Sequence, residues 1–288
     1  MLAQSIVGGL AAGSVYALVA LGLALVYKTS RLVNFALGEM AMLSAFVAYS
    51  ATSRLGLPYP AAFAVALAFA ALLGLTVERV LIRRLQEAPH LSVVVVTLGL
   101  GSVLYTVAGW VWGYDTKTFP PPVSGGPLVI PLGAGLVLTR LNVLIFAVAV
   151  VLMTLVWRLI YHSHWGLGMR ALVEQRDAAS MLGVRPDYVS RVTWAIAAML
   201  GAVAGMLIAP ITFLDPNMMS DVVVKAFAAA VLGGLTSLPG AVVGGLAIGV
   251  LDNVVAQVWG TPLKATAAFA VIVVVLILRP TGLWGERD

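Results

Sequence analysis

The side chains with the most chemistry to offer in this sequence are the few ionisable groups that interrupt its long apolar runs. An ionisable group is expensive to bury in a membrane, so it is a default candidate for a transport pathway or a proton relay. Glu39 is one such group and lies close to the start of an apolar run. We interpret it as a helix N-terminal cap or a partner of Lys28 or Arg31, with the lining of a substrate path as the alternative.

Further candidates lie in the fourth apolar run and in the long run from 222 to 258. Asp252 and Asn253 are suited to a polar interior lining, and the hydroxyls of Thr97 and Ser102 can also line a path. Membrane helices commonly bury such hydroxyls without any transport role. The candidate substrate path consists of Asn34, Glu39, Thr97, Ser102, Gly233, Gly234, Asp252 and Asn253.

Several common catalytic arrangements are missing from the sequence. Cysteine is absent, which removes thiolate metal sites and cysteine nucleophiles. His162 and His164 are two residues apart, which is the wrong spacing for a helical zinc pair. None of the four lysines stands in a phosphate-binding loop motif. We therefore expect no catalytic residue, no metal site and no cofactor bound by this chain.

The composition predicts an integral membrane protein. Hydrophobic residues make up 61% of the 288 residues and charged residues only 10%, whereas a soluble domain carries about 25% charged residues. The net charge of +5 does not indicate nucleic-acid binding, because the basic residues stand singly between apolar runs. They fit topology signals better.

The lengths of the apolar runs predict an all-α fold, a polytopic transmembrane helical bundle with about eight or nine membrane segments. The expected segments are 3–27, 32–52, 59–81, 91–113, 141–161, 190–213, 222–258 and 264–279. The run from 222 to 258 is too long for one plain helix. Gly233-Gly234 and Pro239-Gly240 interrupt it, so we expect a broken or hairpin segment there.

Basic residues near the segment ends predict the orientation. With the N-terminus outside and the C-terminus cytoplasmic, twelve of the seventeen lysines and arginines fall on the cytoplasmic side. The five that remain outside or at the outer boundary are Arg54, Lys117, Arg140, Lys225 and Lys264. The same orientation places a loop rich in proline and glycine, from about 114 to 140, on the extracytoplasmic side, where it can contact a soluble partner.

Small residues at four-residue spacing predict close contacts between helices. The pairs are Gly9 and Gly13, Gly201 and Gly205, Gly240 and Gly244, and Gly245 and Gly249. Lipid provides no hydrophobic force between helices, so helices associate where small residues let their backbones approach. Together the pairs predict one tight transmembrane domain that spans residues 1–288.

The longest charged stretch with helical periodicity runs from Gly166 to Val184, within a cytoplasmic segment of about 163–188. Leu172 and Leu182 fall near one face of the predicted helix and Arg170 on another, and Gly183 followed by a proline is a typical stop signal. Periodicity alone fits an ordinary interfacial loop helix. A short amphipathic helix between two membrane segments is also suited to docking against a cytoplasmic partner.

The sequences of this stretch and of six other motifs resemble those of the permease subunits of ABC importers for branched-chain amino acids. These seven motifs cover nearly the whole chain in the order of that family. They are Asn34-Phe35-Ala36-Leu37-Gly38-Glu39-Met40, Thr97-Leu98-Gly99-Leu100, Arg170-Ala171 to Gly183, Lys225-Ala226-Phe227, Val231-Leu232-Gly233-Gly234-Leu235, Pro239-Gly240-Ala241 and Arg279-Pro280-Thr281-Gly282-Leu283-Trp284-Gly285. The short length favours the LivH-like branch of the family over the LivM-like branch.

The resemblance implies a multi-pass subunit of the bacterial cytoplasmic (inner) membrane that works with several partners. These are a related LivM-like permease, two cytoplasmic ATPase subunits that use ATP and Mg²⁺, and an extracytoplasmic amino-acid-binding protein. The implied ATPase-coupling residues are Gly168, Arg170, Ala171, Glu174, Asp177, Ala178, Leu182 and Gly183. The sequence departs from the expected pattern at Gln175-Arg176, where an acidic or asparagine-containing stretch is expected, and this affects the detailed ATPase contacts.

Other functions are compatible with parts of the sequence. Urea, short amides or a broader range of amino acids are alternative substrates, because such permeases share the same motifs. A standalone secondary transporter or channel would require paired ionisable residues at mid-membrane and repeat-related halves, and the sequence indicates neither. An intramembrane enzyme would require a catalytic constellation that the sequence lacks.

Overall fold

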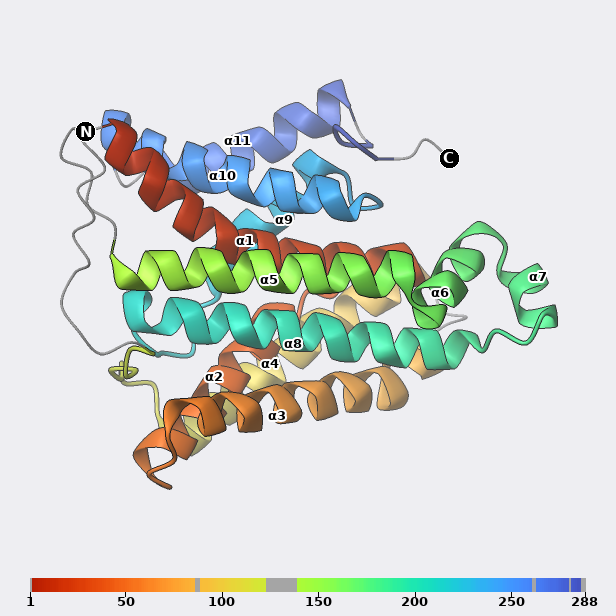
Figure 1. Cartoon of the computed structure of the whole chain (residues 1–288), viewed down its shortest axis with the longest axis horizontal. Coiled ribbons are helices and arrows are strands. Elements are labelled where there is room, and N and C mark those ends of the chain that lie inside the picture. Colours follow the sequence, from red (N-terminus) through yellow and green to blue (C-terminus); the bar gives the residue numbers. More distant parts are fainter. Residues whose placement is uncertain (1, 86–88, 123–138, 261–262, 280, 286–288) are drawn as a thin grey trace.

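The computed structural model describes residues 2–85, 89–122, 139–260, 263–279 and 281–285 (Figure 1). These residues form helices joined by short connections, with one isolated antiparallel bridge. The helices are α1 (Leu2–Ser30), α2 (Leu37–Ser53), α3 (Tyr59–Val80), the 3-10 helix η1 (Ile82–Leu85), α4 (His90–Trp112), α5 (Arg140–His162), α6 (His164–Glu174), α7 (Arg176–Met181), α8 (Pro186–Thr212), α9 (Ser220–Gly233), α10 (Leu238–Trp259) and α11 (Leu263–Leu278). The predicted all-α bundle is confirmed for this part of the chain.

The helices follow the predicted membrane segments closely. Helices α1, α3, α4, α5 and α8 each cover one predicted segment, with ends shifted by a few residues. Within the described residues, six helices are long and apolar enough to cross a membrane, namely these five and α10. Helices α2, α9 and α11 are shorter, with 17, 14 and 16 residues. The chain is therefore a multi-pass membrane protein that combines long and short helices.

The predicted break in the run from 222 to 258 is confirmed. Helix α9 ends at Gly233, Gly234 has a φ of +101°, and α10 begins at Leu238. A residue with a side chain is strained at such a φ, which explains the glycine at 234. The hydroxyl of Ser237 then accepts a hydrogen bond of 3.2 Å from the Gly240 N–H and caps the start of α10.

Helices α1 and α8 form the centre of the bundle. Helix α1 packs against α5, α8, α9 and α10, and α8 packs against α1, α2 and α3. Most side chains of both helices are buried, and Trp194 of α8 is 1% exposed. Helices α3, α4, α5 and α11 keep large apolar side chains on the outer surface. Such a surface suits lipid or another membrane subunit.

The glycine pairs lie in close contacts between helices, as predicted. Gly9 and Gly13 of α1 face Gly245 and Gly249 of α10, and a Cβ added at Gly249 would lie 2.2 Å from the Gly13 Cα. Gly201 and Gly205 of α8 face α2, and Gly240 and Gly244 of α10 face α9. A side chain at these positions would meet backbone or close side-chain atoms. The glycines therefore set the distances between the helices.

The described C-terminal residues close the end of the α9–α10 hairpin. The backbone N–H of Leu283 donates to the Leu232 carbonyl at 2.9 Å, and the N–H of Trp284 donates to the Gly233 carbonyl at 3.1 Å. The last carbonyls of a helix lack partners inside the helix. The motif near residue 282 thus has a structural role, because it satisfies the end of α9.

Two connections on the opposite end of the bundle are joined by the isolated bridge. The backbones of Lys117, after α4, and Leu214, after α8, exchange two hydrogen bonds of 2.9 Å each. Phe119 is buried, and its ring meets the Tyr59 ring edge-on at 6.2 Å. Only the beginning and end of the predicted loop from 114 to 140 are described, because residues 123–138 lie outside the described residues.

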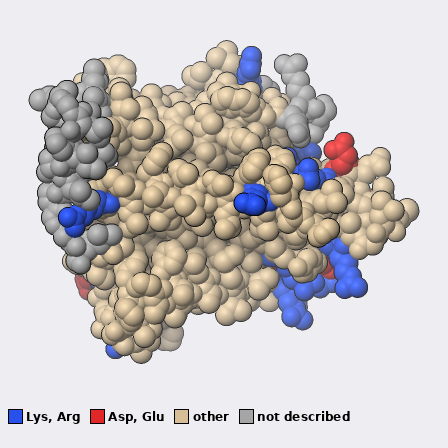
Figure 2. Space-filling model, in the orientation of Figure 1, with Lys and Arg blue, Asp and Glu red and all other residues tan. Residues whose placement is uncertain are grey.

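The two ends of the bundle differ in charge. Figure 2 shows lysine and arginine side chains gathered mainly at the end that carries α6 and α7. Exposed arginines at this end include Arg79 in the last turn of α3, Arg83 and Arg84 in η1, and Arg176 and Arg185 around α7. The end with the first turn of α1 and the Lys117–Leu214 bridge carries fewer (Figures 1 and 2). This asymmetry fits the predicted cytoplasmic position of α6 and α7.

Candidate functional site

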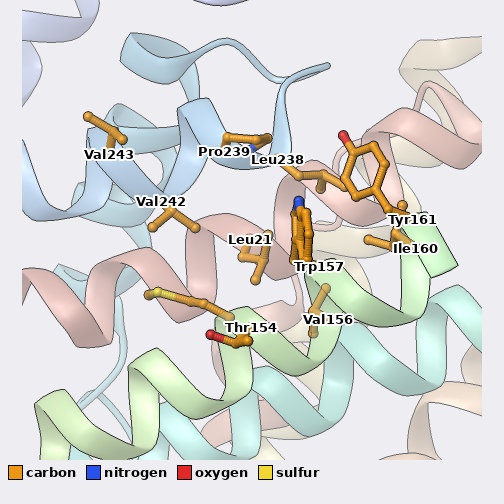
Figure 3. Close-up of a pocket in the computed structure, with 11 residues that line it drawn as sticks. Leu21, Thr154, Val156, Trp157, Ile160, Tyr161, Leu238, Pro239, Val242 and Val243 are labelled. Atoms are coloured by element: carbon orange, nitrogen blue, oxygen red, sulfur yellow. The ribbon is translucent and has the colours of Figure 1, made fainter.

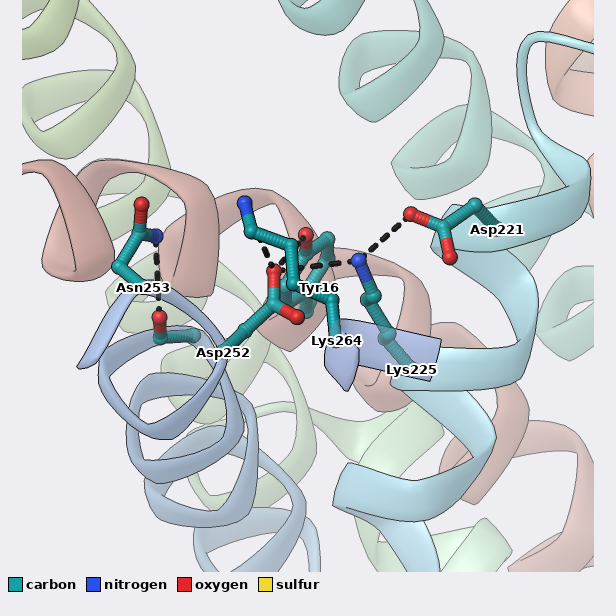
Figure 4. A network of polar contacts seen from close by, with 7 residues as sticks. Tyr16, Asp221, Lys225, Asp252, Asn253 and Lys264 are labelled. Carbon is teal, nitrogen blue, oxygen red and sulfur yellow. Dashed lines mark hydrogen bonds and ion pairs between the residues drawn. The ribbon is translucent and has the colours of Figure 1, made fainter. Parts of the chain in front are cut away.

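The most polar part of the bundle interior is an ion-pair network formed by Tyr16, Asp221, Lys225, Asp252 and Lys264 (Figure 4). The Lys225 ammonium lies 2.5 Å from an Asp221 carboxylate oxygen and 3.1 Å from an Asp252 oxygen. The same Asp252 oxygen lies 3.7 Å from the Lys264 ammonium and accepts a hydrogen bond of 3.4 Å from the Tyr16 hydroxyl. The network therefore ties α1, α9, α10 and α11 together.

Burial makes the inner part of this network energetically demanding. The side chains of Lys225 and Asp252 are 3% and 4% exposed, whereas that of Asp221 is 63% exposed. A buried charge is tolerated only with a close opposite charge and further hydrogen bonds. The Tyr16 ring lies 5.6 Å from the Lys225 ammonium, at the distance of a cation–π contact, so it also supports the buried lysine.

The network bears on two predictions. Lys225 was expected outside or at the outer boundary, and the structure adds that its side chain is buried between helices. Paired ionisable residues at mid-membrane were not expected, and the structure shows that Lys225 and Asp252 form a buried pair inside the bundle. Topology signals do not reveal this burial, because they treat a basic residue as exposed to water unless a partner compensates its charge. The pair does not require a standalone transporter, since it also serves as a tie between helices.

One signal in the sequence could have revealed part of the network. Asp221 and Lys225 stand four residues apart at the start of an apolar run, which places them on the same face of a helix. Asp252 lies 27 residues after Lys225, and Tyr16 lies 236 residues before Asp252. No periodicity joins positions so far apart. Only the packing of α1, α9 and α10 brings them together.

Asn34 and Glu39 lie at the start of α2. The Asn34 side chain is buried and accepts a hydrogen bond of 3.0 Å from the Ala36 N–H, which fixes the turn before the helix. Glu39 lies in the first turn of α2, where the helix dipole stabilises a negatively charged carboxylate. One of its oxygens is buried without a hydrogen-bond partner, and a Cβ at Gly101 of α4 would lie 3.3 Å from it.

The other predicted path residues bond locally. The Thr97 hydroxyl donates to the Val94 carbonyl at 3.0 Å, and the exposed Ser102 hydroxyl donates to the Leu98 carbonyl at 3.3 Å. Asn253 is next to Asp252 but donates to the Gly249 carbonyl at 3.2 Å (Figure 4). Gly233 packs against Gly240, and Gly234 packs against the C-terminal residues Thr281 and Gly285. The structure thus brings Asp252 into the ion-pair network, which the other predicted path residues do not join.

The prediction of a single helix from 166 to 184 is wrong, because the structure has two helices there. Gln175, with a φ of −147° and a ψ of 99°, separates α6 from α7. Gly183 has a φ of +90° and ends the second helix, which confirms the predicted stop. The two helices project from the basic end of the bundle (Figure 1).

Helix α6 is anchored to the end of α5. Ser163 accepts a hydrogen bond of 3.0 Å from the Gly166 N–H and caps α6. A Cβ at Gly166 would lie 2.1 Å from the Ile160 carbonyl oxygen, so only glycine lets the chain fold back there. The Arg170 guanidinium lies 5.4 Å from the centre of the Tyr161 ring. Arg170 therefore belongs to the contact between α5 and α6 and is not a free surface charge.

The outer part of this segment is more exposed and more apolar than predicted. Met181 and Leu182 are 88% and 86% exposed at the end of α7, and Glu174, Asp177 and Ala178 are also exposed. The prediction included Leu182 but missed Met181. Two adjacent apolar side chains are thus exposed at the end of this projecting segment.

A second set of charges joins the start of α8 to α3 and η1. The Arg83 guanidinium lies 2.5 Å from the Asp187 carboxylate in the first turn of α8. Arg191, one turn further on, lies 4.0 Å from Glu78 of α3, whose side chain is fully buried. These contacts hold the start of α8, and with it the end of the α6–α7 segment, against α3 and η1.

Two cavities between the helices are mostly apolar. One, of about 300 Å³, lies between α1, α5 and α10, and Leu21, Trp157 and Pro239 are among its lining residues (Figure 3). Another, of about 490 Å³, lies between α3, α5 and α8 and is lined by apolar side chains alone. Both suit hydrocarbon groups. Neither offers charged groups to a polar ligand.

The fold defines a multi-pass helical membrane protein, and the sequence carries no nucleotide-binding motif of its own. The chain belongs to the family described as "Branched-chain amino acid transport system / permease component", which matches residues 5–278. It is 32% identical to the Pseudomonas aeruginosa permease protein BraD of a high-affinity branched-chain amino acid transport system, over 99% of this chain and 96% of the relative. It is 30% identical to the corresponding LivH protein of Escherichia coli K12, over the same shares of the two chains.

A solved structure with the same general fold is that of PsaBC from Streptococcus pneumoniae in complex with a Fab. The TM-score is 0.51 at 10% sequence identity, and the match covers 96% of this chain and 92% of that chain. At this identity the likeness concerns the fold alone. It agrees with the helical bundle described above.

Proposed function

We propose that this chain is the permease subunit of an ABC importer that carries leucine, isoleucine, valine or related amino acids into the bacterial cell. Its family and the names of BraD and LivH support this substrate class. The observation that carries the ATP-driven mechanism is the projecting α6–α7 segment with its exposed apolar end. ATP and Mg²⁺ are used by two separate ATPase subunits in the cytoplasm.

The proposed orientation has the N-terminus outside and the C-terminus in the cytoplasm. At about 1.5 Å per residue, the shorter helices α2, α9 and α11 measure roughly 20–25 Å, and the hydrocarbon core of a bilayer is about 30 Å thick. These three helices complete the bundle with the six longer ones, which gives nine segments. The chain then lies in the bacterial inner membrane. Its basic end, with α6 and α7, faces the cytoplasm.

The remaining partners follow from this orientation. A related LivM-like permease covers part of the apolar outer surface, and the translocation path lies between the two permeases. An extracytoplasmic amino-acid-binding protein delivers the substrate to the end with the Lys117–Leu214 bridge and the loop from 114 to 140. Asn34 and Glu39 at the start of α2 and the ion-pair network are the polar groups that this path offers.

Docking of the ATPase is tested by changing the exposed end of α7. Leu182→Asp should reduce the ATPase recovered with the purified permease by roughly tenfold, because a charge in the centre of an apolar contact is costly. Arg170 is a poorer test, since its contact with Tyr161 belongs to the permease itself. The measurement is the ratio of ATPase to permease after affinity purification in detergent.

The matched control is Leu55→Asp at the opposite end of the bundle. Leu55 is 72% exposed and follows α2, so the same charge is introduced far from α7. This variant should retain the ATPase at the wild-type ratio. An unchanged ratio for Leu182→Asp would exclude the proposed docking surface, and a wild-type permease without ATPase would contradict the importer mechanism.

A further inference from the structure

We propose that Asp221 and Lys225 form a binding site for the two charged groups of a zwitterionic α-amino acid. In this site the Lys225 ammonium binds the α-carboxylate and the Asp221 carboxylate binds the α-ammonium group. The inference rests on the proposed function, since it concerns how the transported amino acid is held within the permease.

The unequal burial of the two residues makes the site accessible. Their ion pair joins a carboxylate that is 63% exposed to an ammonium that is 3% exposed. Asp221 lies in the first turn of α9, so the pair extends from the surface into the bundle. A ligand carboxylate that replaces Asp221 at Lys225 leaves the lysine paired. The displaced Asp221 carboxylate is then available for the ligand ammonium.

The inner residues keep Lys225 in place during this exchange. Asp252 is 3.1 Å from the lysine and remains its partner, and the Tyr16 ring lies 5.6 Å from the ammonium. The second oxygen of Asp252 is buried and has no hydrogen-bond partner, so it can accept a further bond when Lys225 shifts. The lysine therefore need not leave its position between the helices for the ligand to bind.

The charge balance of the network selects a zwitterion. Two aspartates and two lysines compensate one another, and the ion pairs among them connect all four. A ligand with one charge would leave an uncompensated charge beside a buried pair, which is unfavourable. A ligand with both charges preserves neutrality. The half-buried Val224, next to Lys225 in α9, offers apolar surface to its side chain.

The experiment measures binding of radiolabelled L-leucine to the complete transporter in nanodiscs without the binding protein. Asp221→Asn should weaken leucine binding at least about tenfold, because it removes the partner of the ligand ammonium. Asp221→Glu, which keeps the charge, should retain most of the binding. The matched control is Asp215→Asn, a nearby acidic residue outside the network that accepts a hydrogen bond of 2.7 Å from the Asn217 N–H.

Two analogues of leucine test the charge selection. Leucinamide lacks the carboxylate and 4-methylpentanoate lacks the ammonium group, so neither should displace leucine. Equal leucine binding by wild type and Asp221→Asn would overturn the proposal. Displacement of radiolabelled leucine by either analogue, at the concentration at which unlabelled leucine displaces it, would also overturn it. Asparagine preserves a hydrogen bond to Lys225 at an exposed position, so failure to fold does not explain a loss of binding.

ATP hydrolysis stimulated by the leucine-loaded binding protein separates the two proposals. A wild-type complex that responds to the loaded binding protein but binds no leucine by itself would overturn the site and leave the proposed function intact. A correctly assembled complex that neither responds to any amino-acid-loaded binding protein nor binds leucine would overturn both. Loss of leucine binding in Asp221→Asn alone supports the site.

Discussion

Replacing Lys225 with methionine is expected to destabilise the folded chain by about 3–5 kcal/mol, because a buried carboxylate loses its closest charged partner. Asp221 can return to water, since it is 63% exposed, but Asp252 is 4% exposed and cannot. Lys264 remains at 3.7 Å from Asp252 and limits the loss. The measurement is the thermal unfolding transition of the purified chain in detergent, which should move down by several degrees.

Two further variants identify the cause of this loss. Lys264→Met should cost much less, because Lys264 is 28% exposed and farther from the carboxylate than Lys225. The double variant Lys225→Met with Asp252→Leu should recover most of the stability, since it removes both buried charges and keeps apolar volume. A double variant as unstable as the single one would show that the network is not held by the charge pair.

Placing leucine at Gly249 is expected to separate α1 from α10 and to prevent a stable bundle. A Cβ at this position would lie 2.2 Å from the Gly13 Cα and 2.5 Å from the Gly9 carbonyl oxygen, and backbone atoms cannot rotate away. Overpacking in a core typically costs 1–3 kcal/mol and occasionally more. We expect a cost of at least about 3 kcal/mol here, with alanine at the same position less harmful.

The measurement is the fraction of monodisperse protein after extraction, compared with that of a matched variant in α1. Gly8→Leu is the control, because nothing lies within 4 Å of a Cβ at Gly8. It stands next to Gly9 in the chain but faces open space. Normal yields for Gly249→Leu would show that α1 and α10 do not require close backbone contact.

Much of the fold could be predicted from the sequence because membrane segments obey simple rules of length and hydropathy. An apolar run long enough to cross the bilayer becomes a helix, since its backbone groups must be satisfied internally. This rule located α1, α3, α4, α5 and α8, and the glycines located the break between α9 and α10. Glycine pairs at four-residue spacing also predicted the close contacts, because one helix face carries both members of a pair.

Local bends were harder to predict than helices. The stretch from 166 to 184 has helical periodicity throughout, yet Gln175 interrupts it. Neither glycine nor proline stands at that position, so no ordinary stop signal is present. The anchoring of α6 on α5 through Gly166 and Tyr161 belongs to tertiary packing. The exposed apolar end at Met181 and Leu182 became visible only in the folded chain.

The sequence by itself determined the class of this protein, most of its membrane segments and its family motifs. Each of these depends on residues close together in the chain, whose spacing sets a helix, a turn or a charge pattern. The tertiary structure alone decided the partners of Asp252, which come from α1, α9 and α11. It also decided that Lys225 lies inside the bundle. A buried charge is tolerated only beside a compensating charge, and the buried partner of Lys225, Asp252, comes from another helix.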